Sequence, residues 1–407
     1  MTAGSPSMAT GMLAAHVARH VPIAHAAAGT TPAGLDPRWQ AARRILCVRL
    51  DSLGDVLMCT PAMRALRAAV PGRTLTLLGA PAGVAALPFI PELDDAIVCQ
   101  VPWMKNAGAQ PRIGVAALAE VLAARRFDAA VILTSATQSA LPAALLCHQA
   151  GIPLRLAHCR ENPYGLLSDW VLDPEPAMPV RHEVMRQLGL VKRVGCGSAG
   201  LGLSFAVRAA DAAAVRRRLR VAGIDADAPW LLLHPGASAA SRRYPPNQWA
   251  QVLRLLAHAF ALPLVLTGSA EEAALVDGIR MAAGVPAVSL AGQLTLGELG
   301  AALQLAALAL ANNTGPAHIA AAVGTPTVDL YALTNPQHTP WKVPNRVLFH
   351  DVPCRFCFRS DCPAGHHACL AGVEPARVVE AVRSLLAPAQ SRAPDGDGLQ
   401  HSDTGNA

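Results

Sequence analysis

The sequence predicts an α/β protein made of two doubly wound, Rossmann-like domains that face a cleft. Its 407 residues exceed what one hydrophobic core usually supports. From residue 44 onward, short apolar runs alternate with Ala- and Leu-rich helical segments, the pattern of a parallel sheet with helices on both faces. The pattern breaks in a glycine-rich stretch, residues 186–210, and then begins again, which indicates a second domain of the same kind.

Four strands are expected in the first domain, with helices such as residues 111–126 between them. Each strand is a short apolar run bounded by a Gly, Pro or Asp turn. The four runs are residues 45–50, 74–79, 95–101 and 128–133.

Five strands are expected in the second domain, at residues 230–234, 263–268, 287–292, 308–312 and 325–331. Helices are expected at residues 247–260, 296–307, 316–323 and 374–386, the last of them packed across the domain junction. Ligands of such sheets bind beyond the carboxyl ends of the strands, so we expect the functional residues there.

The glycine-rich stretch sets the domain boundaries. We place the linker near residues 193–205, which gives a first domain of residues 41–195 and a second of residues 205–387. Residues 1–40 and 388–407 are interpreted as a disordered extension and a disordered tail. The N-terminal segment lacks the basic region and the clean apolar stretch of a signal peptide.

Composition narrows the class of protein. The chain is 52% hydrophobic and 15% charged, and it contains no uninterrupted apolar run of about 18 residues that would span a bilayer. The net charge of +6 suits an anionic substrate or membrane surface, whereas 4% aromatic residues without basic runs between them argue against nucleic-acid binding. Six scattered cysteines are interpreted as reduced, buried thiols, so the expected compartment is the cytosol.

The stretch RLDSLGDVLMCTPAMRAL, residues 49–66, follows the first strand. Ser52 and Asp55 have the spacing of a capping box, and Gly54 allows close backbone approach. The helix begins either near Gly54, with Pro61 inside it, or at Thr60 after a turn. Asp55 is open to two interpretations at this point: a helix cap, or an ionised carboxylate that accepts a proton from a sugar hydroxyl.

Two stretches of the second domain carry charged groups after strands. In LLLHPGASAASRRYPPNQW, residues 231–249, Arg242 and Arg243 suit a diphosphate, although a solvated loop explains them as well. In LTGSAEE, residues 266–272, Glu271 and Glu272 suit either ribose hydroxyls or the first turn of a helix.

A third stretch, ANNTGPAHIAAAVGTP at residues 311–326, is the strongest local signal for anion binding. A strand leads into a helix that opens at Pro316 and ends at Gly324, and its first N–H groups are free to face an anion. Thr314 can cap this helix and donate to phosphate. His318 lies on the first turn, where a structural role is the ordinary alternative.

In this order and spacing, the four stretches resemble glycosyltransferase family 9, the heptosyltransferases of lipopolysaccharide inner-core synthesis. The resemblance covers about residues 44–387 and implies the GT-B fold, with the acceptor on the N-terminal domain and the nucleotide sugar on the C-terminal domain. It also implies inverting, metal-independent heptose transfer from ADP-heptose to an anionic glycolipid, with no cofactor required. Such an enzyme would contact the cytosolic face of the inner membrane peripherally.

The resemblance also assigns roles to single residues. Asp55 falls on the proposed general base, and Ser52 and Gly54 belong to its turn on the acceptor side. Arg242 falls on the cation that binds phosphate. The remaining donor-binding residues implied by the resemblance are Ser238, Glu271, Asn313, Thr314, Gly315 and His318.

The sequence departs from the family pattern at two positions. Asn313 and Asn335 stand where the family usually has Asp, and each change removes a charge near the donor. The exact donor sugar is therefore left open. The alternatives are a family member that moves another sugar to a different glycan, and a non-catalytic protein that binds nucleotide sugars. A Rossmann dehydrogenase is disfavoured because no G-x-G-x-x-G follows the first strand.

Four cysteines cluster near the C-terminus: Cys354, Cys357, Cys362 and Cys369. Their spacing permits a tetrahedral zinc site but is tighter than in the usual zinc ribbons. Similar Cys-rich segments occur in members of the family, which favours a structural feature. We expect no catalytic metal.

Overall fold

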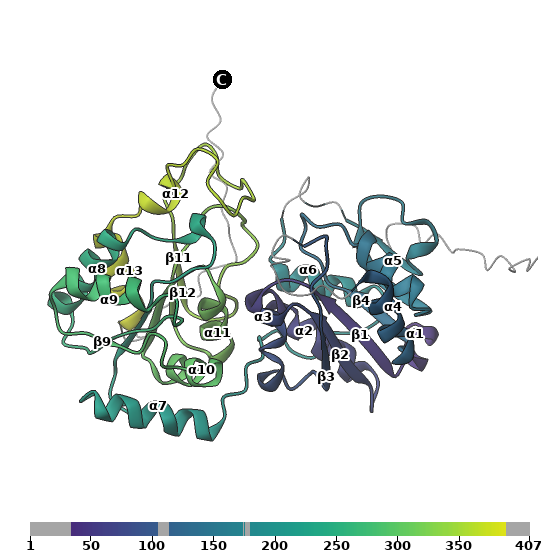
Figure 1. Cartoon of the computed structure of the whole chain (residues 1–407), viewed down its shortest axis with the longest axis horizontal. Helices are drawn as coiled ribbons and strands as arrows, with labels where there is room; N and C mark the ends of the chain where they lie inside the picture. The colour runs from purple at the N-terminus through teal and green to yellow at the C-terminus, as the bar shows by residue number, and fades with distance from the viewer. Residues whose placement is uncertain (1–33, 105–113, 174, 176–179, 388–407) are drawn as a thin grey trace, which may run out of the picture.

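The computed structural model describes residues 34–104, 114–173, 175 and 180–387, and shows two α/β domains side by side (Figure 1). Residues 1–33 and 388–407, which contain most of the predicted extension and the whole predicted tail, lie outside the described residues. The last part of the predicted extension is ordered, contrary to expectation. Helix α1, Pro37–Ala41, is capped by Asp36, and its Trp39 side chain is fully buried.

The first domain is a six-stranded parallel sheet in the order β3-β2-β1-β4-β5-β6. Its strands are β1 (Arg44–Arg49), β2 (Thr74–Gly79), β3 (Asp95–Val98), β4 (Ala129–Ile132), β5 (Leu154–Cys159) and β6 (Asp169–Leu172). Its main helices are α2 (Leu53–Ala69), α3 (Pro81–Val84), α4 (Val115–Ala124), α5 (Leu141–Gln149) and α6 (Glu183–Lys192). Helices α2 and α6 pack together on one face of the sheet, and α4 and α5 on the other.

The second domain repeats this arrangement in the order β12-β11-β10-β7-β8-β9. Its strands are β7 (Leu231–His234), β8 (Leu264–Leu266), β9 (Val288–Ser289), β10 (Leu308–Asn312), β11 (Thr327–Leu330) and β12 (Asn345–Leu348). Its helices are α7 (Ala209–Val221), α8 (Pro246–Ala259), α9 (Ala273–Ala283), α10 (Leu296–Leu305), α11 (Gly315–Val323), α12 (Ala368–Ala371) and α13 (Pro375–Leu386).

Both sheets have the strand order of dinucleotide-binding folds, so each has a switch point where the chain reverses direction across the sheet. In the first domain this point lies between β1 and β4, and in the second between β7 and β10. The two-domain α/β prediction is confirmed. The strands β5, β6 and β12 were not predicted, because β5 is interrupted by Arg155 and His158 and the other two are short edge strands.

Helix α2 begins at Leu53 and continues through Pro61, so the alternative start at Thr60 is wrong. Proline cannot donate to the carbonyl four residues earlier. Here that carbonyl, of Leu57, accepts a hydrogen bond of 2.7 Å from the Thr60 hydroxyl. The same hydroxyl oxygen accepts from the backbone N–H of Ser204 at 2.9 Å, which ties the interdomain segment to α2.

The domains are joined by residues 193–208, all of which the structure describes and none of which forms a helix or strand. Phe205 in this segment stacks on Phe89 of the first domain with ring centroids 4.6 Å apart, and it also packs on Gly300 of α10. Across the junction α2 packs against α11, and one apolar cluster runs through both. Helix α13 packs instead on α8 and on β10–β12, so its predicted position across the junction is wrong.

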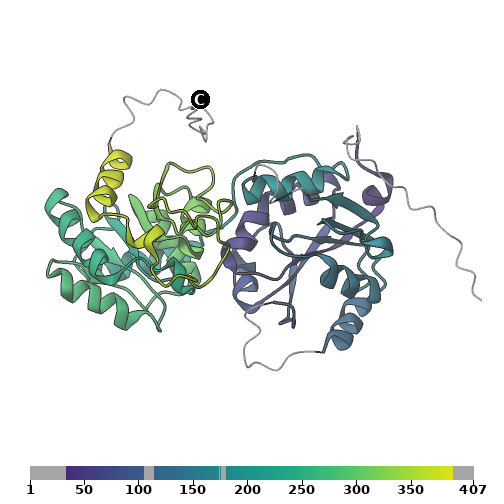
Figure 2. The ribbon, with the colours of Figure 1, turned by 90° about the horizontal axis from the view of Figure 1, so that it is seen from above.

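Figure 2 shows the same two domains from above, with described parts of both next to each other at the junction. Among the described residues, none of the helices has both the length and the apolar character that a bilayer span requires.

Candidate active site

A cavity of about 910 Å³ opens between the domains, at the carboxyl ends of both sheets. The first domain contributes the turn after β1 and the loops after β3 and β4. The second contributes the loops after β7 and β11, together with Phe358, Arg359 and Ser360 of the Cys-rich segment. The cavity therefore lies where the strand order predicts a ligand site.

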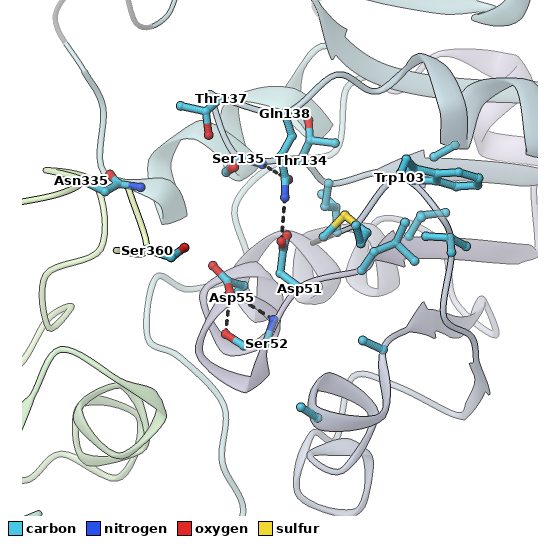
Figure 3. A pocket seen from close by; sticks show the side chains of 18 of the residues that line it. Asp51, Ser52, Asp55, Trp103, Thr134, Ser135, Thr137, Gln138, Asn335 and Ser360 are labelled. Atoms are coloured by element: carbon cyan, nitrogen blue, oxygen red, sulfur yellow. Dashed lines mark hydrogen bonds between the residues drawn. The ribbon is translucent and has the colours of Figure 1, made fainter. Parts of the chain in front are cut away.

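Asp55 lies at the start of α2 and points into this cavity (Figure 3). Its Oδ2 accepts from the Ser52 hydroxyl at 2.7 Å and from the Ser52 backbone N–H at 3.2 Å, which is the capping-box contact that the spacing predicts. The Asp55 side chain remains 17% exposed. Capping and a role in the cavity are thus compatible, because the cap contacts use one oxygen and leave part of the carboxylate open to the cavity.

The fully buried Arg49 side chain, at the end of β1, holds Asp55 in place. Its Nη2 lies 3.1 Å from Asp55 Oδ1, and the same guanidinium forms ion pairs with Asp51 at 2.9 Å and Glu183 at 2.6 Å. Burial alone would raise the pKa of the Asp55 carboxyl, but the Arg49 guanidinium and the Ser52 hydroxyl hold it well below its usual range. Asp55 is therefore ionised at neutral pH.

The second domain meets Asp55 through α11. A side chain at Gly54 would collide with the His318 ring, and a Cβ at Gly315 would lie 3.1 Å from Leu53 Cδ2. The first turns of α2 and α11 thus approach each other, and the positive ends of both helix dipoles lie near the cavity. Gly54 has the close-approach role that the sequence predicts.

The His318 imidazole packs against Gly54 and is buried. Burial, with the neighbouring His338, lowers the pKa of His318 to about 3, and burial also lowers the pKa of His338. Both imidazoles are therefore neutral at physiological pH and do not supply positive charge to the site.

The turn before α11 differs in part from its prediction. The Thr314 hydroxyl donates to the Asn312 carbonyl at 3.2 Å, and in the described part of the chain no side-chain hydrogen bond caps α11. The predicted capping role of Thr314 is therefore wrong in this structure. The missing side-chain cap favours anion binding, because the first backbone N–H groups of α11 have no side-chain acceptor.

Asn313 is buried and is not among the residues that line the cavity. Its Nδ2 donates to Asp329 Oδ2 at 3.0 Å and to the His338 carbonyl at 2.8 Å. Burial raises the pKa of Asp329 to about 7. A carboxylate at position 313 would face the Asp329 carboxylate, whereas the amide donates a hydrogen bond to it.

The loop after β7 presents Ser238 and Arg242 to the cavity. The Arg242 side chain is half-buried and has no hydrogen-bond or ion-pair partner among the described residues, so its guanidinium is available to an anion. Arg243 instead donates to the Ala237 carbonyl at 2.7 Å and stabilises the loop. The loop is tied to the Cys-rich segment through Ser241, which contacts the carbonyls of Arg359 and Ser360.

The two glutamates after β8 differ in position. Glu272 packs against Gly236, where any side chain would collide with its carboxylate, and its Oε2 lies 3.8 Å from His234 Nε2. Glu271 is exposed to solvent. The residue that lies beside the loop after β7 is therefore Glu272, one position beyond the predicted Glu271.

The family of the chain follows from comparison with known proteins. The family model described as glycosyltransferase family 9 (heptosyltransferase) matches residues 115–368, more than half of the chain. The chain belongs to glycosyltransferase family 9. Its two domains have the GT-B fold, as the sequence predicts.

Relatives of this chain include lipopolysaccharide heptosyltransferase 2 of Salmonella typhimurium, which is 26% identical over 84% of this chain and 98% of its own length. Matches to lipooligosaccharide heptosyltransferase 2 of two Campylobacter jejuni strains are 27% and 28% identical, and this chain spans about half the length of those relatives.

Two solved structures share the fold. A family 9 glycosyltransferase from Veillonella parvula has a TM-score of 0.68 at 20% identity, covering 84% of this chain and 97% of that one. The ADP-heptose lipopolysaccharide heptosyltransferase II of E. coli has a TM-score of 0.64 at 24% identity, covering 84% and 98%.

The family 9 site brings together most of the predicted residues but also contains several that were not predicted. Ser52, Asp55, Ser238 and Arg242 line the cavity, and Gly54, Gly315 and His318 form the domain contact beside it. The residues not predicted are Arg49, Asp51, Gln138, Glu183, His338 and Arg359. The sequence feature that could have identified Arg49 is a charged residue at the end of an otherwise apolar strand.

The four clustered cysteines are free thiols in a segment that borders the cavity. Within the part of the chain that the structure describes, no set of three or more His, Cys, Asp or Glu side chains is arranged to hold a metal ion. The expectation that catalysis needs no metal remains a prediction.

Proposed function

We propose that this enzyme transfers a heptose from ADP-heptose to a lipopolysaccharide core acceptor, with inversion at the anomeric carbon and without a metal ion. The observation that carries the proposal is the position of Asp55. It is an ionised carboxylate on the first domain, in the first turn of α2, which contacts the first turn of α11 on the second domain. The proposed base and Arg242, the proposed cation for the diphosphate, line the same cavity.

In the proposed reaction, the acceptor hydroxyl approaches the anomeric carbon from the face opposite the diphosphate. Its oxygen forms the new glycosidic bond, the bond from the anomeric carbon to the diphosphate oxygen breaks, and the hydroxyl proton passes to the Asp55 carboxylate. The hydroxyl becomes strongly acidic as its oxygen bonds to carbon, so a carboxylate with a lowered pKa is basic enough. ADP leaves with the electron pair of the broken bond.

The second domain would stabilise the leaving ADP. Arg242 offers an unpaired guanidinium, and the N-terminus of α11 offers N–H groups and the positive end of its dipole. Glu272 lies beside the loop after β7, where a carboxylate accepts hydrogen bonds from ribose hydroxyls. The acceptor, an anionic glycolipid, would bring the enzyme to the cytosolic face of the inner membrane, where a net charge of +6 favours peripheral contact.

A second candidate is transfer of another sugar, and one observation favours it. Asn335 lines the cavity with a neutral amide at a position where the family resemblance implies a carboxylate. A neutral group there changes which sugar hydroxyls are bound well, because an amide accepts hydrogen bonds less strongly than a carboxylate.

The test is transfer from a panel of nucleotide sugars to core oligosaccharide isolated from a strain that lacks this enzyme, followed by mass spectrometry. ADP-heptose should give a product heavier by one heptose residue, with ADP released in equal amount. Transfer of a different sugar in preference to heptose would support the second candidate. Binding of ADP without transfer to the acceptor would refute both.

A further inference from the structure

Asp51, in the turn after β1, is a second carboxylate of the cavity to which the proposed reaction assigns no role. Its Oδ1 accepts a hydrogen bond of 2.6 Å from Gln138 Nε2, and its Oδ2 lies 2.9 Å from Arg49 Nε. Gln138 is held in turn by the Ser135 backbone N–H, which donates to its Oε1 at 3.0 Å. Asp51 is 17% exposed, and Figure 3 shows it beside Asp55 with its carboxylate directed toward Gln138.

Asp51 and Asp55 have different surroundings. Asp55 follows Gly54, which contacts His318 of the second domain, so Asp55 lies where the donor and acceptor walls meet. The hydrogen-bond and ion-pair partners of Asp51 among the described residues, Arg49 and Gln138, both belong to the first domain. Asp51 therefore lies on the acceptor wall, on the side of Asp55 toward β4.

The charge around Asp51 is negative. One guanidinium, that of Arg49, is shared by the carboxylates of Asp51, Asp55 and Glu183. Burial lowers the pKa values of the nearby His318 and His338, so these groups are neutral and do not compensate. A carboxylate in such a cluster accepts hydrogen bonds from hydroxyl groups and repels phosphate and carboxylate groups.

Cations of the cavity are found on the opposite wall. Among the described residues that line it, the Lys and Arg side chains are Arg242 and Arg359, and both belong to the second domain. The described acceptor wall offers two carboxylates, the amides of Gln100 and Gln138, and the hydroxyls of Ser52, Thr134, Ser135, Thr137 and Ser139. This wall suits a neutral polyhydroxyl group.

We propose that Asp51 and Gln138 form an acceptor subsite that binds a second hydroxyl of the acceptor sugar, adjacent to the hydroxyl that attacks at Asp55. The subsite excludes a phosphate or carboxylate at that position of the sugar. The acceptor residue that enters the cavity is thus a sugar with two neighbouring free hydroxyls, even when the glycolipid that carries it is anionic elsewhere. This inference rests on the proposed function.

Acceptor binding at this subsite should depend on pH, which a purely structural role of Asp51 would not require. Burial raises the pKa of Asp51 to about 6, against the opposing influence of Arg49. The charged groups that act on it are Arg49, Asp55 and Glu183, with Gln138 as its hydrogen-bond donor. Asp51 is therefore ionised, and a strong acceptor, above about pH 6. Acceptor binding should weaken as the pH falls through this value.

The experiment compares the full-length wild type with Asp51→Asn, Gln138→Met and Asp95→Asn. Asp95 forms an exposed ion pair with Arg125 at 2.6 Å, outside the cavity, and is the control for loss of a carboxylate. Initial rates are measured with ADP-heptose and core oligosaccharide from a strain that lacks the enzyme, between about pH 5 and 9. Acceptor binding is also measured by calorimetry in the presence of ADP.

Asp51→Asn should raise KM for the acceptor about tenfold or more, the loss expected for a hydrogen bond to a charged group, and change kcat less than about threefold. KM for ADP-heptose should stay constant, and the decline of kcat/KM for the acceptor below about pH 6 should disappear. Gln138→Met should raise KM for the acceptor in the same direction, and Asp95→Asn should match the wild type.

An unchanged acceptor KM in both subsite variants would overturn the proposal, and so would a loss of kcat in Asp51→Asn as large as that caused by a change at Asp55. The outcomes for the two proposals are separable. A wild type that binds the oligosaccharide but transfers no heptose refutes the proposed function, and calorimetry of Asp51→Asn still decides whether Asp51 contacts the acceptor.

Discussion

His318 of α11 packs directly on Gly54 of α2, across the junction between the two domains. The contact leaves no room for a Cβ at residue 54, and Asp55 is the next residue in the chain. The position of the proposed base relative to the proposed anion site therefore depends on a glycine. The contact explains why a glycine precedes Asp55. Gly54 allows α2 and α11 to approach closely, and Asp55 supplies the carboxylate.

Gly54→Ala should lower kcat/KM by about tenfold or more, because the methyl group displaces His318 and the α11 turn, and small misplacements of reacting groups are costly. Steady-state rates measure this effect. The matched control is Gly278→Ala in α9, where a Cβ meets open space and alanine favours the helix. Equal activity of both variants would show that the close approach does not set the catalytic geometry.

Arg49→Met should destabilise the fold by about 3–5 kcal/mol near pH 8, because it leaves three buried or half-buried carboxylates without a countercharge. Urea unfolding at several pH values measures the loss.

The contribution of Asp55 to the pH dependence of stability should also change sign between the two proteins. In the wild type the pKa of Asp55 is lowered, so its stabilising contribution is present above the unfolded pKa and is lost as the pH falls below about 4. In Arg49→Met the carboxylates are disfavoured in the folded state, so stability should rise as the pH falls from 8 to 5. A variant with the pH slope of the wild type would contradict this account.

Asp329→Asn should stabilise the protein at pH 8 by on the order of a kcal/mol. Burial raises the pKa of Asp329 to about 7 in the folded state. The stability that the protonated Asp329 carboxyl contributes is therefore fully present below the unfolded pKa of about 4, and it is lost as the pH rises to about 7. Thermal unfolding should show the largest difference at pH 8 and a small one near pH 4. The control Asp277→Asn, at a half-exposed ion pair with Arg280, should show no such trend.

Glu272→Gln should raise KM for the nucleotide sugar about tenfold, with a smaller effect for Glu271→Gln. The reason is position: Glu272 packs on Gly236 in the loop after β7, and Glu271 is exposed. Calorimetry with ADP gives the same comparison without turnover. A larger loss of nucleotide-sugar affinity in Glu271→Gln than in Glu272→Gln would instead support Glu271, the residue predicted from the sequence.

The fold was largely predictable because most strands are apolar throughout and recur at regular spacing. β5 escaped prediction because Arg155 and His158 interrupt its apolar pattern, and the short edge strands β6 and β12 bury too little to show one. The start of α2 was ambiguous because Thr60 and Pro61 mimic a helix start, and only the Thr60 hydroxyl on the Leu57 carbonyl shows how Pro61 is accommodated.

The residues that line the cavity were predictable where local motifs carry them, as at Asp55 and Arg242. The site was not predictable where the chemistry depends on tertiary contacts. Arg49 acquires its role from Glu183, 134 residues away, and Asp51 from Gln138, 87 residues away. Likewise, the choice between Glu271 and Glu272 depends on how the turn before α9 packs on Gly236.

The most direct test of the account is heptose transfer by Asp55→Asn, measured with saturating ADP-heptose and core oligosaccharide. The variant preserves the shape of the side chain but loses the charge that pairs with Arg49, so it should unfold at a lower urea concentration yet remain folded under assay conditions, with ADP affinity close to that of the wild type. We predict a loss of about 10²–10⁴ in kcat, the contribution of a positioned general base. Transfer at the wild-type rate by a folded, ADP-binding Asp55→Asn enzyme would contradict the central claim.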